Sequence, residues 1–185
     1  MNSYVVPHDP ETIAALDLLS AGVASIELAK NFSHSKDCFS CCLEIADGRW
    51  VQLQATGEDL EFKFEVFPLH GRPVATPRAG EHHALALTAP VKVTPLVTES
   101  WLDPAAPTGP TLGSDPVMQF VGQPGSAPDT ASATCRYIGG VELAGANGNT
   151  LVIATGSFPY SLHVSGFYED RFFRRGAYVG LLGEA

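Results

Sequence analysis

The chain has 185 residues, the length of one domain, and 45% hydrophobic content lets it bury a core without disulfides or metals. Its 18 glycines and 14 prolines favour many turns over long helices. The formal net charge is −9, and residues 1–65 hold eleven acidic residues against four basic ones. Phosphates repel such a surface, so nucleic acid is excluded as a partner there, whereas a basic protein fits. The alternative is that the acidic surface only keeps the protein soluble.

The first predicted element is a helix that begins after Asp9. Asp9 is a good N-cap residue, and Pro10 suits the first helical position. Apolar residues then recur at near-helical spacing, at Ile13, Leu16, Leu19, Val23 and Ile26. Gly22 would weaken the middle of this helix or allow a close approach. We therefore predict a helix to about Asn31, with one apolar stripe that packs on a sheet.

An antiparallel meander of three strands is predicted from Phe39 to Phe67. Apolar and polar residues alternate with the period of half-buried strands over residues 39–45, 51–55 and 60–66. Asp47-Gly48 suits the two-residue turn of a hairpin, which needs positive φ. Gly57-Glu58-Asp59 is expected to form the second turn. Residues 68–80 contain three prolines and two glycines, so we interpret them as a loop.

The middle of the chain is expected to be irregular. Residues 84–97 alternate weakly, and Pro90 and Pro95 divide them, so we predict two short strands. From Leu102 to Thr134 the composition is rich in Pro, Gly, Ala, Ser and Thr, which indicates a long loop excursion. Loops of this length in a compact domain are usually functional or disordered.

Regular structure is predicted again after residue 134. Apolar and polar residues alternate on both sides of Asn147-Gly148-Asn149, which predicts a second hairpin. The remaining strands are expected at residues 135–143, 150–154, 160–164 and 177–182. The first three of these would make a second meander.

No motif in the sequence identifies a reaction. It contains no nucleophile elbow, phosphate loop, dinucleotide fingerprint or zinc-protease motif. Zinc could be bound by His34, Cys38 and Cys41, with Cys42 or Cys135 as a fourth ligand. Cys41 falls on the apolar face of its strand, however, where a buried small hydrophobic residue is the better interpretation. We therefore predict no metal site and no cofactor.

Three histidines offer another site for chemistry. His82 and His83 follow Glu81, but neighbours on a strand point to opposite faces and do not chelate together. His163 shares a strand face with Ser161, as a base and a nucleophile would. A histidine held within a strand explains each position more simply, so no catalytic residue is assigned.

The sequence favours a soluble cytoplasmic location. The first residues, MNSYVVPHDP, hold no basic region followed by an apolar run, and no apolar stretch reaches membrane-spanning length. Three of the four cysteines crowd at positions 38, 41 and 42, a spacing unlike a disulfide framework. We therefore expect reduced thiols and no membrane partner.

Three segments near the end of the chain carry a resemblance to a known class of proteins. Gly139–Leu143, Asn147–Ile153 and Phe158–Val164 resemble the C-terminal hairpin of small bacterial immunity-type proteins, which bind and block a cognate toxin. The resemblance covers residues 139–164 only. It implies a non-catalytic protein whose partner is a toxin or effector, and it implies no catalytic residues.

These observations predict a single α+β domain over residues 1–185. An N-terminal helix packs on a mainly antiparallel sheet of two meanders, with an irregular excursion at 68–134. The first functional hypothesis is a non-catalytic cytoplasmic protein that neutralises or escorts a basic protein partner, while the oligomeric state stays open. The predicted partner-binding surface is the acidic end of the first meander, namely Glu58, Asp59, Glu61 and Glu65. The alternative hypothesis is a small-molecule or metal-dependent enzyme that uses His82, His83, His163 or the cysteines at 38, 41 and 42.

Overall fold

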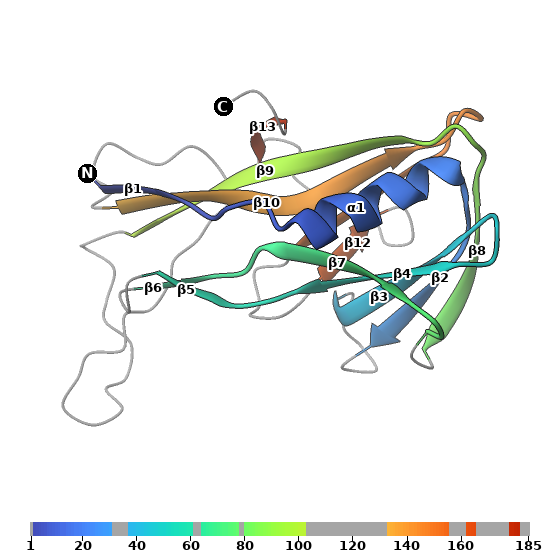
Figure 1. The fold of residues 1–185 in the computed structure, drawn as a ribbon, viewed down its shortest axis with the longest axis horizontal. Helices are drawn as coiled ribbons and strands as arrows, with labels where there is room; N and C mark the ends of the chain where they lie inside the picture. The colour runs from blue at the N-terminus through green and yellow to red at the C-terminus, as the bar shows by residue number, and fades with distance from the viewer. Residues whose placement is uncertain are drawn as a thin grey trace.

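A computed structural model describes residues 2–30, 37–60, 64–77, 80–102, 133–155, 162–165 and 178–181. They form one short α-helix, one 3-10 helix and thirteen β-strands (Figure 1). In chain order these are β1 (Asn2–Val5), α1 (Pro10–Leu18), η1 (Leu19–Ala21), β2 (Val23–Lys30), β3 (Asp37–Ile45), β4 (Trp50–Ala55), β5 (Glu58–Leu60), β6 (Phe64–Val66), β7 (Leu69–Val74), β8 (Glu81–Leu87), β9 (Lys92–Leu102), β10 (Ala133–Ala144), β11 (Thr150–Thr155), β12 (Leu162–Ser165) and β13 (Tyr178–Leu181). The α+β prediction, with an N-terminal helix on mainly antiparallel sheet, is confirmed.

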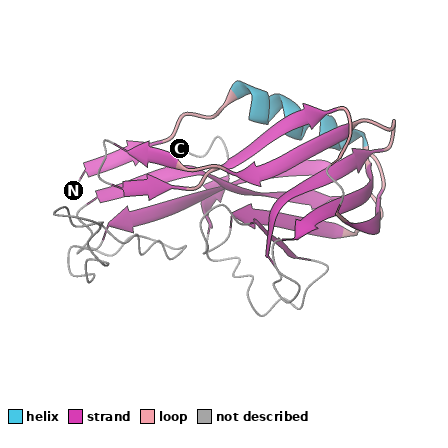
Figure 2. Ribbon diagram, turned by 90° about the horizontal axis from the view of Figure 1, so that it is seen from below, coloured by secondary structure: helices cyan, strands magenta, loops and turns pink. Residues whose placement is uncertain are grey.

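Eleven strands form one branched sheet. Its main path is β13-β9-β10-β11-β12-β3-β2-β8, with β1 paired to β10 and the β4-β7 pair attached to β3. Only β1 and β10 pair in parallel among the described strands. Figure 1 shows β1, β9 and β10 facing the layer that holds β2 to β7, with α1 between β10 and β7 in this view, and Figure 2 shows the helix along one side of the strands. The sheet branches at two strands: β3 pairs with β2, β4 and β12, and β10 pairs with β1, β9 and β11.

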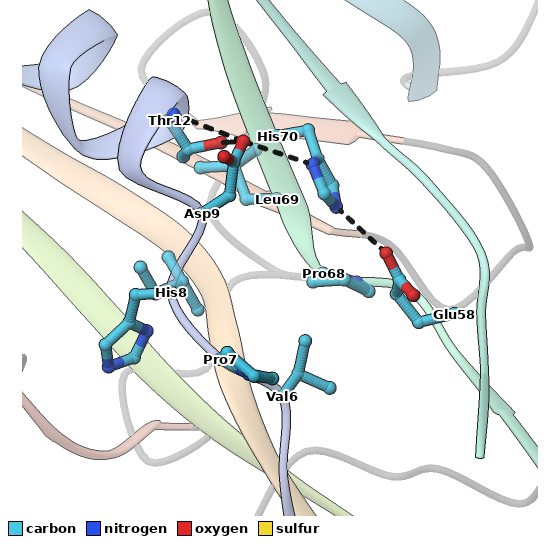
Figure 3. Close-up of a pocket in the computed structure, with 10 residues that line it drawn as sticks. Val6, Pro7, His8, Asp9, Thr12, Glu58, Pro68, Leu69 and His70 are labelled. Carbon is cyan, nitrogen blue, oxygen red and sulfur yellow. Dashed lines mark hydrogen bonds and ion pairs between the residues drawn. The ribbon is translucent and has the colours of Figure 1, made fainter. Parts of the chain in front are cut away.

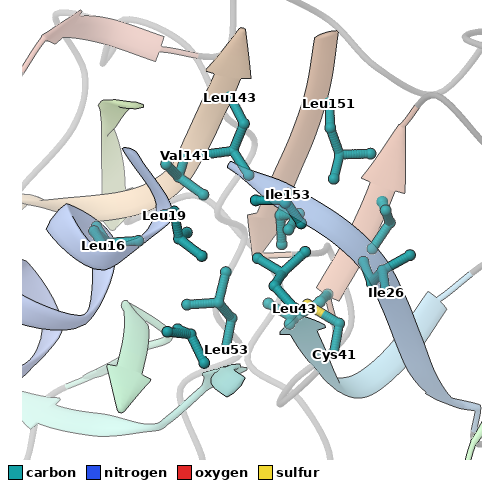
Figure 4. Close-up of a cluster of buried hydrophobic side chains, with 14 of the residues drawn as sticks. Leu16, Leu19, Ile26, Cys41, Leu43, Leu53, Val141, Leu143, Leu151 and Ile153 are labelled. Atoms are coloured by element: carbon teal, nitrogen blue, oxygen red, sulfur yellow. The ribbon is translucent and has the colours of Figure 1, made fainter. Parts of the chain in front are cut away.

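The main core lies between these strands and the helix (Figure 4). Its side chains come from α1, η1 and eight strands, and they include Leu16, Leu19, Ile26, Cys41, Leu43, Leu53, Val141, Leu143, Leu151 and Ile153. Each of these is at most 2% exposed. The alternation that predicts the strands therefore also identifies the side chains that face the core.

The helix is shorter than predicted. It begins where expected, since the Asp9 carboxylate accepts two backbone N–H groups of the first turn, but it ends at Leu18. The chain then turns at Gly22, whose φ of 104° few other residues adopt. The strand β2 replaces the second half of the predicted helix. Ile26 and Leu28 are both buried, two residues apart, which is the period of a strand.

The prediction of the first meander is confirmed for its first hairpin and wrong for its third strand. β3 and β4 pair across Asp47-Gly48, and Gly48 has a φ of 86°. The predicted third strand at 60–66 is divided between β5 and β6, which pair with each other. β4 pairs instead with β7, inside the segment 68–80 that the sequence predicts to be a loop.

The strands from β4 to β7 form one long hairpin. Their pairing keeps the same register from the Trp50–Val74 pair to the Leu60–Phe64 pair, and a backbone hydrogen bond joins the two stretches. The strand β5 therefore continues to Leu60, whereas the sequence places a turn at residues 57–59.

Other predicted strands are confirmed, with some changes of length. β8 and β9 lie on either side of Pro90 and are longer than predicted. β10, β11 and β12 form the second meander, Gly148 has a φ of 83°, and β13 is the predicted last strand. Residues 103–132 lie outside the described part of the chain, so the irregular excursion there stays a prediction, as does the single-domain organisation. No helix in the described segments has the length and apolar character needed to span a membrane.

Candidate functional site

A cleft of about 150 Å³ lies where the N-terminal end of α1 meets β7 (Figure 3). Its polar lining comes from His8, Asp9, Thr12, Glu58 and His70, and apolar side chains such as Leu69 and Ile138 complete it. These residues come from α1, from its N-cap and the residue before it, and from β5, β7 and β10. The cleft thus joins elements that are far apart in the sequence.

Thr12 fixes the helix to the strand. Its hydroxyl donates to Oδ2 of Asp9 at 2.8 Å and accepts the backbone N–H of Gly71 at 3.0 Å. Thr12 therefore satisfies a donor on the edge of β7 that faces away from β4. A Cβ atom on Gly71 would lie 3.1 Å from Cδ2 of Leu53 and 3.4 Å from Cβ of Ala15. The absence of a side chain at Gly71 thus allows the helix to lie close to the strand.

Asp9 is held by the first turn of the helix. Its carboxylate accepts the hydroxyl of Thr12 and the backbone N–H groups of Glu11 and Thr12. The Thr12 hydroxyl, followed by these N–H groups, holds the pKa of the Asp9 carboxyl below its usual value of 3.8. Oδ2 of the same carboxylate lies 3.8 Å from Nδ1 of His70. An ionised carboxylate therefore borders one side of the imidazole ring.

Glu58 borders the other side of the ring (Figure 3). Its Oε1 atom lies 3.8 Å from Nε2 of His70. Both distances are too long for hydrogen bonds, so neither carboxylate is hydrogen-bonded to the ring. The side chains of Asp9 and Glu58 are 39% and 45% exposed, whereas that of His70 is 27% exposed. Two accessible carboxylates thus flank a less accessible imidazole.

This geometry is better suited to holding a cation than to catalysis. Nε2 of His70 is buried and has no hydrogen-bond partner, so a substrate could reach it only after a rearrangement. The lowered pKa of Asp9 makes this carboxylate a weak base at neutral pH. Among the described residues, no group of three His, Cys, Asp or Glu side chains has the arrangement of a metal site. An ammonium or guanidinium group on an apolar stem suits a cleft with two carboxylates and an apolar wall.

One of the predicted partner-binding residues, Glu58, lines the cleft. Asp59 follows Glu58 on β5 and pairs with Glu65 in the β5-β6 register. Glu61 lies outside the described residues. The prediction of a turn at Glu58 and Asp59 is wrong, because both residues belong to β5 and the long hairpin continues through them.

The histidines of the enzyme hypothesis do not meet in one place. Nδ1 of His82 lies 3.8 Å from Glu27, and Nε2 of His83 lies 3.1 Å from Glu81. His163 is on β12, which β3 and β2 separate from the strand of the other two histidines. These residues therefore do not form a common pocket.

The four cysteines are buried thiols without disulfides. Burial raises the pKa of Cys41 well above its usual value and raises that of Cys135 to about 12. Thiols with such pKa values are poor nucleophiles at neutral pH, and metals bind the thiolate form. His34, the histidine grouped with them in the zinc hypothesis, lies outside the described residues.

Sequence reasoning missed His70 and recognised Asp9 only as a helix cap. The order Asp-Pro-Glu identifies the start of a helix but does not indicate which strand lies beside it. His70 occurs next to glycine and proline, in a segment that resembles a loop. The pairing of β7 with β4 would have been the useful indication, since it places His70 beside the helix N-terminus.

No family model, curated protein or solved structure matches this chain. The resemblance of residues 139–164 to immunity-type proteins therefore stays a prediction.

Proposed function

We propose that this chain is a non-catalytic binding protein that takes a basic side chain of a protein partner into the cleft between Asp9 and Glu58. The observation that carries the proposal is the pair of carboxylates on opposite sides of His70, each 3.8 Å from a ring nitrogen. A lysine or arginine that enters the cleft can pair with these carboxylates, while its alkyl stem lies along Leu69 and Ile138.

The charge around the cleft supports a basic partner. Asp59 follows Glu58 on β5 and pairs with Glu65 on β6, and acidic residues outnumber basic ones by eleven to four in residues 1–65. Such charge speeds the association of a basic protein, and the effect weakens as salt is added. The partner is then a basic toxin or effector, which the chain neutralises or escorts in the cytoplasm.

A defined basic probe tests the proposal. The affinity of a rhodamine-labelled hexa-arginine peptide is measured by fluorescence anisotropy, at low salt and about pH 8. Asp9→Asn and Glu58→Gln each remove one cleft charge, and asparagine also serves as an N-cap, so the helix is kept. We expect each variant to bind about tenfold more weakly than the parent, near the lower end of what a hydrogen bond to a charged group contributes, because both carboxylates are partly exposed.

The matched control is Asp17→Asn, which removes the same charge from an exposed position in the last turns of α1. Its affinity is expected to stay within about twofold of the parent value. Equal affinities for Asp9→Asn, Glu58→Gln and Asp17→Asn would contradict the proposal, because binding would then depend on net charge alone. Melting curves for all variants verify that the fold is retained.

The predicted acidic surface is tested by reversing Glu58, Glu61 and Glu65 to lysine together. If these residues form the partner surface, the triple variant keeps its melting point and binds the peptide mainly with a slower association rate. Unchanged association kinetics in a folded triple variant would place the interface elsewhere on the protein.

A further inference from the structure

We infer that protonation of His70 closes the cleft to the basic partner, so that binding weakens as the pH falls. This inference rests on the proposed function of the cleft. The ring presents a different nitrogen to each carboxylate: Nδ1 faces Asp9 and Nε2 faces Glu58, both at 3.8 Å (Figure 3). His70 therefore lies between the two carboxylates with which an entering cation would pair.

The two protonation states of the imidazole have opposite effects on the cleft. A neutral imidazole has one N–H group and no charge, so it can donate to one carboxylate at most. Uptake of a proton from solvent gives the ring two N–H groups and a positive charge between Asp9 and Glu58. Side chains that are 39% and 45% exposed can approach the ring by the short distance that hydrogen bonds require. Protonated His70 then pairs with both carboxylates and competes with the partner's ammonium or guanidinium group.

We attribute the pH dependence of binding to His70 because of the groups that surround its ring. Asp9 faces it from the N-cap of α1, Glu58 faces it from β5, and its register partner on β4 is the uncharged Gln54. His8 also lines the cleft, but its ring points away from His70 in Figure 3. Asp9 stays ionised over the range in which imidazoles titrate, because the hydroxyl of Thr12 keeps the pKa of this carboxyl low.

The test measures hexa-arginine affinity between about pH 8 and about pH 6, which spans the range where imidazoles take up a proton. For the parent we expect a loss that approaches about tenfold as the ring becomes fully protonated, within the usual size of coupling between two binding events. His70→Gln cannot take up the proton and is expected to bind with nearly constant affinity across this range. His82→Gln is the matched control, since it removes an imidazole that also lies 3.8 Å from a carboxylate, that of Glu27, but outside the cleft, and it should keep the pH dependence of the parent.

A second measurement uses only the parent protein, so it does not require a folded His70 variant. Proton binding and peptide binding oppose each other, so saturating peptide should shift the NMR titration of His70 to lower pH. The shift expected from a tenfold coupling is about one pH unit. An unshifted titration would overturn the inference, as would a His70→Gln variant with the pH dependence of the parent.

The two proposals fail in different ways. Absence of peptide binding by the parent at about pH 8 refutes the proposed function of the cleft. Binding by the parent that depends on Asp9 and Glu58 but not on pH refutes only the role of His70.

Discussion

Replacement of Thr12 by valine removes one hydroxyl from the contact between α1 and β7 and keeps the shape of the side chain. Thr12 is 1% exposed, and its hydroxyl accepts the N–H of Gly71 and donates to Asp9. In the valine variant the N–H of Gly71 stays buried without its acceptor. We expect the free energy of unfolding to fall by about 2 kcal/mol, mainly because a buried unsatisfied N–H costs about 1–3 kcal/mol.

The contributions can be separated with a serine variant. The lost bond to Asp9 adds less to the cost, because a carboxylate that is 39% exposed exchanges the hydroxyl for water. Thr12→Ser keeps the hydroxyl and loses one buried methyl group, which costs about 1 kcal/mol. Valine should therefore destabilise the protein more than serine, although it fills the site better. Urea unfolding at neutral pH measures both differences.

A valine variant as stable as the serine variant would refute the two hydrogen bonds assigned to Thr12. The acid range provides an independent check. The hydroxyl lowers the pKa of Asp9 below 3.8 in the folded protein, so its contribution is complete above that pH and is lost as the pH falls through the lowered pKa. The valine variant should consequently lose less stability than the parent when both are acidified through this window.

Three further predictions follow from single positions. Gly48→Val should cost about 1–3 kcal/mol from backbone strain alone, since no atom lies within 4 Å of the added Cβ, and Gly48→Asn should cost less; an unchanged melting curve would show that the turn is misplaced. Gly139→Ala should cost about 1–3 kcal/mol, because its Cβ would lie 2.3 Å from Cγ2 of Thr98, and combined with Thr98→Gly it should cost less than the sum of the two single losses. Additive losses in the double variant would contradict that contact. The four buried thiols should react slowly with a disulfide reagent in the native protein and all four should react in denaturant, so a lower count would indicate a disulfide.

Local features of the sequence predicted the local structure well. The start of α1 depends on Asp9 and its immediate neighbours, and the hairpin turns depend on Gly48 and Gly148, which have positive φ. Alternation predicted the strands on both sides of each turn, because a half-buried strand needs one apolar face. These properties are decided within a few residues, so one sequence is sufficient to identify them.

Long-range pairing decided what the sequence could not predict. β7 contains Gly71 and Pro73, which resemble loop residues, but a strand with one free edge tolerates both. The apolar residues on both sides of Gly22 fit the periods of a helix and of a strand, and pairing of β2 with β3 and β8 favoured the strand. Because the cleft is formed by these pairings, Asp9, Glu58 and His70 have no common signature in the sequence.

The parallel pairing of β1 with β10 has a consequence for synthesis on the ribosome. Asn2 pairs with Ala133, so the partner of the first strand is made 131 residues later. At about 5–20 residues per second, β1 remains without this partner for roughly 7–26 s. The β3-β4 hairpin can close during this time, since its two strands are neighbours in the chain. Ile138 of β10 lines the cleft, so a nascent chain acquires the complete cleft only after three quarters of it has been translated.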